Sequence, residues 1–226
     1  MLNGIIFKQA LISGANNIVN HRQEVDALNV FPVPDGDTGT NMSMTISAAA
    51  RELQVCEQTD IASVSAKAAA ALLRGARGNS GVILSLIFRG ISNGFKGMDS
   101  ADGKALAKAL ELGKESAYKA VMKPTEGTIL TVIRMAAEAV KNTQETDCKV
   151  VLKSAYEAAK DALLKTPEML PVLKQAGVVD AGGQGFIFIL EGMLSVIEDG
   201  KTVEPIETLD KKDNAKSDKS VVAAGS

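Results

Sequence analysis

Apolar residues recur at helical spacing in nearly every stretch of this chain that separates its glycine-rich turns. Near the N-terminus, Phe7, Leu11, Ala15 and Ile18 would share one face of a helix running from about Gly4 to His21. The same period continues to the last apolar stretch, and segments with strand-like alternation are essentially missing. The sequence therefore predicts an all-α fold of eight or nine helices, many rich in alanine and able to pack closely.

The composition narrows the class of protein. The chain has 226 residues, 46% of them apolar, which suffices for one sizeable core. A formal net charge of −2 and the lack of tryptophan disfavour nucleic-acid binding. Cys56 and Cys148 have neither disulfide-framework nor zinc spacing, and no signal peptide or run of about 20 apolar residues is evident. We therefore expect a cytoplasmic protein with no nucleic-acid partner and no transmembrane segment.

The chain changes character towards its C-terminus. From about Asp210 it is rich in Lys, Asp and Ser and has little to bury. We expect one folded domain over residues 1–203 and a charged tail or linker stub over residues 204–226. The single histidine, His21, forms no constellation with other reactive side chains, which disfavours Ser-His-Asp and Cys-His enzymes.

The stretch Asn29–Met42, NVFPVPDGDTGTNM, combines features that suggest a ligand site. Its two prolines stop any helix, and its two glycines allow the backbone to approach a ligand closely. Asp35 and Asp37 stand just before the start of a helix, so carboxylates and free backbone N–H groups would lie side by side. Carboxylates bind Mg²⁺ and a helix N-terminus attracts phosphate, which together suggest a metal–nucleotide site.

A purely structural interpretation of this stretch is also open. Asp-Gly is a common turn, and Thr or Asn before a helix is often only a cap. Better-known motifs do not fit: residues expected of an EF-hand are missing, there is no P-loop pattern, and the glycines from Gly75 to Gly81 follow a helix and not a strand.

Three further glycine-bearing turns each open a helix, at residues 74–81, 122–128 and 177–185. Such turns are anion-site geometry, and Arg74 and Arg77 could supply positive charge for a phosphate. Thr128 is either a helix cap or a ligand contact, and we favour the cap. The spacing further predicts an N-cap at Asn79 or Ser80.

Helix ends are also predicted elsewhere along the chain. Asp60 should cap the helix that follows it. Thr166 should be the N-cap of a short helix with Pro167 at its first position, ending at Gly177.

Four motifs in order resemble those of the N-terminal kinase domain of bacterial fatty acid kinases, and more distantly those of the nucleotide-binding, DhaL-type component of dihydroxyacetone kinases. They are NVFPVPDGDTGTNM from Asn29, RGARGNSGVILS from Arg74, AVMKPTEGTILTV from Ala120 and GVVDAGGQG from Gly177. The likeness covers roughly residues 1–200, and the joint match is far more specific than any single motif.

The resemblance implies a barrel of about eight antiparallel amphipathic helices that binds ATP or ADP at one end. Two Mg²⁺ ions would bridge the phosphates, with Asp35 and Asp37 as metal ligands and catalytic residues. Asn29 stands near the position of a further family aspartate, with altered spacing, and is a candidate metal ligand. The other matched cofactor-binding residues are Thr38, Gly39, Thr40, Asn41, Asn79, Ser80 and Gly81 for the phosphates or nucleotide, and Thr128, Asp180 and Gly182 for the base and sugar.

The resemblance also implies a kinase that transfers phosphate to a fatty acid held by a separate carrier protein, giving an acyl phosphate. A carboxylate acceptor is already ionised near neutral pH, which is compatible with the lack of an evident base. Two alternatives stay open: the ATP-binding component of a dihydroxyacetone-like kinase, and a regulatory module that binds nucleotide without turnover. A homodimer is also open, and the family usually continues into further domains.

Overall fold

The computed structural model describes residues 1–207, which form ten helices and a pair of two-residue strands. The long helices are α1 (Gly4–Asn20), α3 (Thr38–Gln54), α4 (Ile61–Gly75), α5 (Gly78–Gly94), α6 (Gly103–Ala120), α7 (Ile129–Val140), α8 (Cys148–Met169) and α10 (Ala181–Asp199). The short helices are α2 (Arg22–Ala27) and α9 (Pro171–Ala176). Strands β1 (Leu2–Asn3) and β2 (Ser100–Ala101) pair antiparallel, with Leu2 opposite Ala101. The all-α prediction is confirmed.

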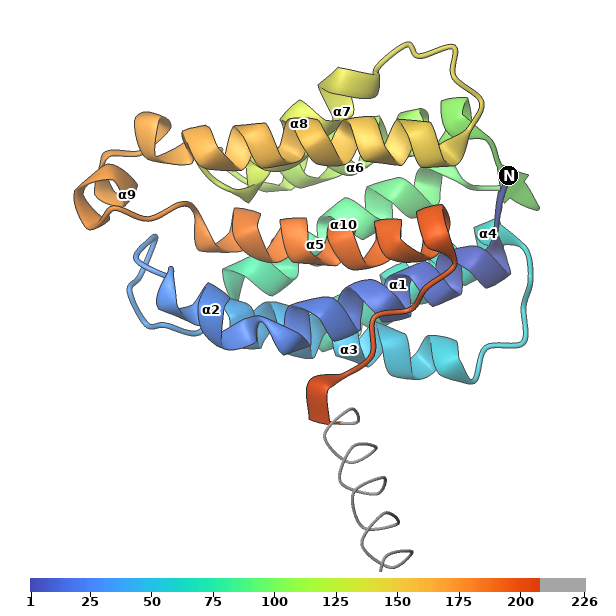
Figure 1. Ribbon diagram of the computed structural model, residues 1–226, viewed down its shortest axis with the longest axis horizontal. Helices are drawn as coiled ribbons and strands as arrows, with labels where there is room; N and C mark the ends of the chain where they lie inside the picture. Colours follow the sequence, from blue (N-terminus) through green and yellow to red (C-terminus); the bar gives the residue numbers. More distant parts are fainter. Residues whose placement is uncertain (208–226) are drawn as a thin grey trace, which may run out of the picture.

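The eight long helices form a closed ring in the order α1, α3, α4, α5, α6, α7, α8, α10 and back to α1. Figure 1 shows them lying side by side along one axis, with α2 and α9 at the same end of the molecule. Because most neighbours are joined by short connections, they alternate in direction. The N-termini of α3, α5, α7 and α10 therefore lie together at the end that carries α2 and α9.

Small residues let neighbouring helices approach closely. A Cβ on Gly192 of α10 would lie 2.6 Å from the carbonyl oxygen of Ser13 in α1, and one on Gly90 of α5 would lie 2.1 Å from that of Leu112 in α6. Only glycine fits at such contacts. The helices consequently pack into a barrel narrow enough for side chains to fill.

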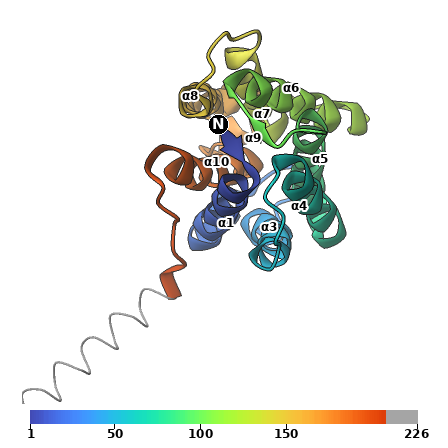
Figure 2. The same ribbon diagram turned by 90° about the vertical axis from the view of Figure 1, so that its right-hand side faces the viewer.

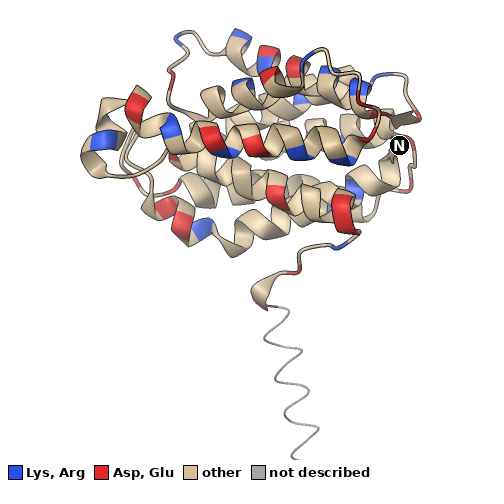
Figure 3. Ribbon diagram, turned by 45° about the horizontal axis from the view of Figure 1, so that its top comes forward, with Lys and Arg blue, Asp and Glu red and all other residues tan. Residues whose placement is uncertain are grey.

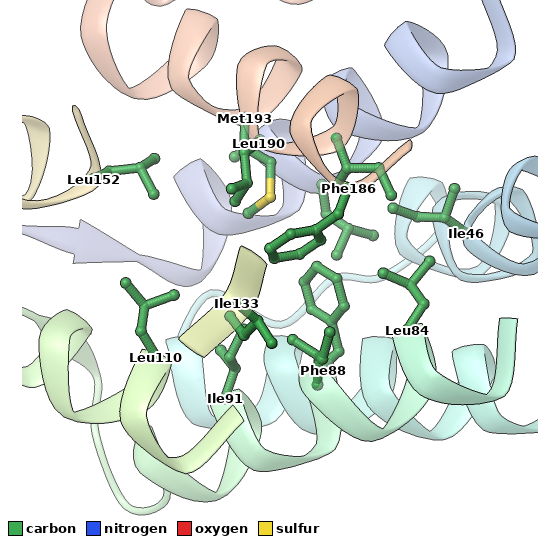
Figure 4. Packing of buried hydrophobic residues seen from close by; sticks show 14 of the residues in the cluster. Ile46, Leu84, Phe88, Ile91, Leu110, Ile133, Leu152, Phe186, Leu190 and Met193 are labelled. Carbon is green, nitrogen blue, oxygen red and sulfur yellow. The ribbon is translucent and has the colours of Figure 1, made fainter. Parts of the chain in front are cut away.

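The interior of the barrel is a continuous apolar core. Figure 4 shows side chains from α3, α5, α6, α7, α8 and α10 pointing into the middle, among them Phe186, Phe88 and Met193. A void of about 30 Å³ remains among them. The many apolar positions at helical spacing in the sequence are thus explained by one core enclosed by all eight long helices.

The end of α8 differs from the predicted boundary. Thr166 and Pro167 lie inside α8, and the following short helix begins at Pro171. A proline in a helix leaves the carbonyl four residues earlier without its usual partner. Here the Thr166 hydroxyl donates to the Leu163 carbonyl at 2.7 Å, so the helix continues past Pro167. The predicted end at Gly177, with a positive φ of 68°, is confirmed.

Residues after α10 turn back along α1. The Ser13 hydroxyl accepts the N–H of Val203, and Asn16 and Asn20 donate to the carbonyls of Val203 and Glu204. The first residues of the predicted tail, which starts at 204, are thus bonded to the barrel. The rest of that tail, residues 208–226, lies outside the described residues.

Two features relate to the expected lack of a nucleic-acid partner and of a transmembrane segment: the distribution of charge on the surface and the apolar helix α10. Lys and Arg are interspersed with Asp and Glu along the visible helices, without a large single-sign area (Figure 3). Within residues 1–207, α10 is the one helix long and apolar enough to cross a membrane by length and composition. Of its apolar window, 72% is buried inside the protein, as expected for a core helix of a barrel.

Candidate functional site

A cavity of about 610 Å³ opens at the end of the barrel where the N-termini of α3, α5, α7 and α10 meet. All four glycine-bearing turns singled out in the sequence contribute to its wall. The polar and charged residues that line it are Asn29, Asp35, Asp37, Thr38, Asn41, Asn79, Ser80, Lys123, Thr125, Thr128 and Asp180. The apolar side of the wall includes Phe31, Val33, Val82, Ile83, Leu86 and Val121.

The loop between α2 and α3 brings two carboxylates to this cavity. Asp35 is exposed and Asp37 is half-buried, and neither carboxylate has a hydrogen-bond or ion-pair partner among residues 1–207. The Phe31–Pro32 peptide bond in the same loop is cis. Two unpaired carboxylates beside a cavity wall are free to bind a cation.

Asn29 is a buried brace for this loop. Its side-chain oxygen accepts the backbone N–H groups of Asp37 at 3.1 Å and of Thr38 at 3.3 Å. Its nitrogen donates to the carbonyl of Val33 at 3.0 Å. An amide oxygen has two lone pairs, and both are engaged here. The geometry therefore explains Asn29 without a metal, and its candidate role as a metal ligand stays a prediction.

The start of α3 is clamped from α2. The carboxylate of Asp26 accepts the Thr40 backbone N–H at 2.9 Å and the Thr40 hydroxyl at 2.7 Å. A Cβ on Gly39 would lie 2.2 Å from the carbonyl oxygen of Arg22, so glycine permits the close contact of α2 with α3. With Asp26 and Asn29 bonded to it, the N-terminus of α3 has little left to offer a phosphate.

The N-terminus of α5 is different because it carries no side-chain cap. Arg77 occupies the cap position without such a bond, and the helix starts at Gly78, one residue before the predicted cap at Asn79 or Ser80. Within the described chain, the backbone N–H groups of residues 78–80 have no protein partner. These residues line the cavity. Of the helix starts at this cavity, that of α5 therefore offers the most free backbone N–H groups, which is what a bound anion would need.

The glycines at this turn allow close contact with α3. Gly78 has φ of 64°, and a Cβ there would lie 2.5 Å from the Asn41 side-chain nitrogen. A Cβ on Gly81 would lie 2.4 Å from the Thr45 hydroxyl oxygen, which also accepts the N–H of Arg77 at 3.1 Å. Gly81 thus serves packing between α3 and α5.

Asp180 joins the starts of α7 and α10. Its carboxylate accepts the backbone N–H of Gly183 at 2.8 Å and also that of Ile129. The side chain is deeply buried, and this burial raises its pKa to about 6 against the lowering effect of the two N–H donors. The Thr128 hydroxyl accepts the N–H of Leu130 at 3.3 Å, so its expected role as a cap is confirmed.

The predicted site residues divide into two groups. The structure brings most of them to the one cavity, namely Asn29, Asp35, Asp37, Thr38, Asn41, Asn79, Ser80, Thr128, Asp180 and Gly182. Gly39, Thr40 and Gly81 do not line it and instead make the contacts between helices described above. Their assignment to the ligand followed from the motif as a block, which cannot separate cavity-facing from helix-facing positions.

Other contributors were missed or misassigned. Arg74 forms an ion pair with Glu52 on the surface, and neither it nor Arg77 lines the cavity. Lys123 does line it, although nothing marked it out in the sequence beyond its place in a glycine-bearing turn. The structural role of Asp26 could have been suspected from its position in a short helix just before residues 28–37, the acidic loop that carries Asp35 and Asp37.

A magnesium ion fits the donors that are present. Within residues 1–207, no group of three or more His, Cys, Asp or Glu side chains forms a closed metal site. Mg²⁺ is commonly held by one or two carboxylates together with substrate phosphates and water. Asp35 and Asp37 are such a pair, on the same wall as the uncapped start of α5.

Comparison with known proteins places the chain in a family. The model of the DAK2 domain matches residues 32–195. The protein YloV of Bacillus subtilis (strain 168) is 47% identical over 204 residues, which is 89% of this chain and 37% of YloV. An uncharacterized protein of Staphylococcus aureus (strain bovine RF122 / ET3-1), SAB1090, is 43% identical over 212 residues, 93% of this chain and 39% of its own length. The chain thus spans well under half the length of these relatives.

Solved structures support the same fold. The dihydroxyacetone kinase from C. freundii, solved in complex with AMP-PNP and Mg²⁺, superposes with a TM-score of 0.62 at 18% identity, covering 86% of this chain and 34% of that one. Its native form gives a TM-score of 0.56 at 19% identity, covering 86% and 35%. The eight-helix barrel is therefore the fold that the resemblance implied. With a matching domain model over most of its length and these relatives, the chain belongs to the DAK2 domain family, of DhaL type.

Proposed function

We propose that this chain is an ATP- and Mg²⁺-dependent kinase domain that transfers phosphate to a fatty acid held by a carrier protein, giving an acyl phosphate. The observation that carries the proposal is the arrangement of one cavity. Two unpaired carboxylates, Asp35 and Asp37, share its wall with the uncapped N-terminus of α5. This pairs a cation site with an anion site, as a metal–nucleotide requires.

The cavity also has the size and composition that a nucleotide needs. Its volume of about 610 Å³ lies within the range typical of small-molecule sites. Val82, Ile83 and Leu86 of α5 and Val121 at the end of α6 give the cavity wall an apolar part. This part suits a flat base, while the polar start of α5 suits the phosphates.

Phosphoryl transfer asks the protein chiefly for positioning and charge stabilisation. Asp35 and Asp37 would hold Mg²⁺, which neutralises charge on the phosphates when bound. The backbone N–H groups of Gly78, Asn79 and Ser80 would fix the phosphates in place. Asn29 and Asp26 would hold the loop that carries the two aspartates and the start of α3.

The chemistry of the acceptor is suggested by the lack of a base in the cavity wall apart from Asp35 and Asp37, which this proposal assigns to Mg²⁺. No histidine is among the described residues that line the cavity, and the one buried carboxyl, Asp180, already accepts two backbone N–H groups. A carboxylate acceptor needs no proton removed, whereas a sugar hydroxyl does. This favours a fatty acid over a ketose as acceptor.

A protein that delivers the acceptor is suggested by the rim of the cavity. Val33 and Val82 line the cavity and are 58% and 45% exposed, and Met122, between two lining residues, is 97% exposed. Exposed apolar side chains around a site are typical of a protein-binding surface. We further propose that the reaction takes place in the cytoplasm, where the two free buried cysteines would stay reduced.

Two tests separate the proposal from its alternatives. Calorimetry of the chain with ATP, in Mg²⁺ and in a chelator, should show binding only with Mg²⁺. Transfer should then be assayed with a fatty acid on its carrier, trapping acyl phosphate as the hydroxamate, and with dihydroxyacetone and a cognate substrate-binding protein. YloV serves as the longer reference, because this chain matches only 37% of its length and transfer by the longer protein can be compared with transfer by this chain.

Each outcome has a definite meaning. Hydroxamate formation by YloV or by this chain supports the acyl kinase. Transfer only to dihydroxyacetone would make it a ketose kinase, and Mg²⁺-dependent binding with no transfer by either protein would favour a nucleotide-binding regulatory module.

A further inference from the structure

Lys123 is the one cation that lines the cavity within the described part of the chain. Its side chain is exposed and has no ion-pair or hydrogen-bond partner among residues 1–207. The other candidates are engaged or displaced: Arg74 pairs with Glu52, and Arg77 lies outside the cavity wall. An unpaired ammonium group on the wall of a cavity proposed to bind nucleotide can donate charge-assisted hydrogen bonds to a phosphate.

The loop that carries Lys123 is anchored by a cluster of polar side chains that no step proposed so far uses. The carboxylate of Glu126 accepts the Tyr118 hydroxyl of α6 at 3.0 Å and the Arg134 guanidinium of α7 at 2.9 Å. It also accepts the Thr131 hydroxyl of α7, and Arg134 donates to Tyr118 at 3.2 Å. Glu126 thus ties the loop to both helices that flank it.

The pKa shifts in this cluster favour the protonation states that its hydrogen bonds need, an ionised Glu126 and a neutral Tyr118. Burial alone would raise the pKa of Glu126, but hydrogen bonds from Thr131, Arg134 and Tyr118 outweigh it and lower the pKa. Burial raises the pKa of Tyr118 to about 12, so its hydroxyl remains a donor at neutral pH. The carboxylate stays ionised and bonded near neutral pH.

The following residues add a second anchor. The N–H of Gly127 donates to the Thr131 hydroxyl at 2.8 Å, and Gly127 has φ of 84° where its backbone packs against Met169 and Leu170. Val121, at the other end of the loop, packs against the core. The backbone around Lys123 is therefore held in place while its charge is left free.

We propose that Lys123 is a phosphate-binding residue of this cavity, and that Glu126 is a positioning residue which presents it. The inference rests on the proposed binding of Mg–nucleotide. The negative charges of a nucleoside polyphosphate and of the two aspartates add up, and bound Mg²⁺ offsets only part of them. An ammonium group on the same cavity wall therefore makes binding more favourable.

The test is a calorimetric titration of the full chain with Mg–ATP and Mg–ADP over a range of salt concentrations. Lys123→Ala should weaken both affinities by about 10-fold, since a hydrogen bond to a charged group is lost. Its affinity should also depend less steeply on salt than that of the parent. Lys123→Arg should restore part of the affinity because it keeps the charge but not its compact shape.

Lys119 supplies the matched control. It is also an exposed lysine, in the last turn of α6, but it lies outside the cavity. Lys119→Ala should leave affinity and salt dependence as in the parent. Melting temperatures of all lysine variants, followed by circular dichroism, should match the parent, because neither lysine is bonded within residues 1–207.

The role of Glu126 is tested by a double-mutant cycle. Glu126→Ala should weaken Mg–ATP binding, and combining it with Lys123→Ala should add little further loss, because both act through the same contact. Additive losses would overturn the positioning role of Glu126. A Lys123→Ala variant that binds Mg–ATP as the parent does would overturn the phosphate contact. A folded parent that binds no Mg–ATP at all would instead remove the proposed function, and this inference with it.

Discussion

The side-chain oxygen of Asn29 accepts the backbone N–H of Asp37 at 3.1 Å, so the residue that opens the acidic loop is bonded to the one that closes it. The same side chain bonds Thr38 and Val33. One buried amide thereby fixes the loop on which Asp35 and Asp37 stand. The likeness in sequence pointed to Asn29 as a metal ligand, whereas its bonds point to support of the ligands.

Asn29→Asp distinguishes these two roles. We expect the variant to lose about 1 kcal/mol or more in free energy of unfolding, because the donor to Val33 is lost and a carboxylate faces that carbonyl. Mg²⁺ affinity in the presence of ATP should not rise. Urea unfolding and calorimetry measure the two quantities, with Asn142→Asp in the turn between α7 and α8 as the control. Tighter Mg²⁺ binding at unchanged stability would identify Asn29 as a ligand.

Thr40 offers a similar contrast, because its N–H and hydroxyl both bond Asp26. Thr40→Val removes only the hydroxyl bond and should cost about 1 kcal/mol of stability. Mg–ATP affinity should fall with it, since the acidic loop lies between the clamped elements. Thr40→Ser should behave as the parent. If Thr40→Val lost nucleotide affinity at full stability, Thr40 would be a direct ligand as the motif suggested.

Gly78 at the start of α5 tests the phosphate-binding element. Gly78→Ala places a methyl group 2.5 Å from the Asn41 nitrogen at a positive φ and should displace the free N–H groups, weakening Mg–ATP binding by about 10-fold or more. Gly177→Ala is the control, since it has the same kind of backbone strain at φ of 68° with nothing within 4 Å. If Gly78→Ala bound Mg–ATP as tightly as Gly177→Ala and the parent do, α5 would be excluded as the phosphate site.

The fold was predictable because its determinants are local. Positions such as Phe7, Leu11 and Ile18 repeat at the helical period, and Asp60 and Thr128 cap helices where the sequence indicated. Predicted helix boundaries were wrong where side-chain bonds, including one to a residue distant in sequence, determine where the helix ends. Thr166 looks like an N-cap before a proline, yet its hydroxyl repairs the helix that Pro167 would break and also accepts the N–H of Asp180.

The site was predictable as a set of turns, but not residue by residue. Four glycine-bearing turns open four helices whose N-termini meet only because the barrel alternates helix directions. Which residues face the cavity depends on packing between elements: Gly81 contacts Thr45, and Thr40 contacts Asp26. Lys123 could not be singled out from the sequence. Its proposed role rests on its being the one Lys or Arg among the described residues that line the cavity, and no sequence pattern shows that.

Replacing Asp35 or Asp37 should affect Mg–ATP binding without affecting the stability of the fold. Neither carboxylate has a partner among residues 1–207, so Asp35→Ala or Asp37→Ala should change the free energy of unfolding by no more than about 0.5 kcal/mol. Either change should abolish Mg²⁺-dependent ATP binding in calorimetry. Asp161→Ala on the exposed side of α8 is the control for lost negative charge. Parent-like Mg–ATP binding by either variant would refute the metal assignment.

Asp180 should make stability depend on pH. Its pKa in the folded protein is raised from 3.8 to about 6, so between these values the folded state holds more protons than the unfolded state. The sign follows from linkage: stability from this group is fully present below pH 3.8 and is lost as pH rises to about 6. Asn keeps a side-chain oxygen for the N–H of Gly183 and cannot ionise.

Asp180→Asn should therefore gain stability relative to the parent as pH rises. The difference in free energy of unfolding between variant and parent should shift in favour of the variant by on the order of 2–3 kcal/mol from pH 4 to pH 7, at about 1.4 kcal/mol per pKa unit. Urea unfolding of both proteins across this range measures the difference, in which other carboxylates cancel. Asp161→Asn should show no such trend. A pH-independent difference for Asp180→Asn would mean that the carboxylate between α7 and α10 ionises as easily in the fold as in water.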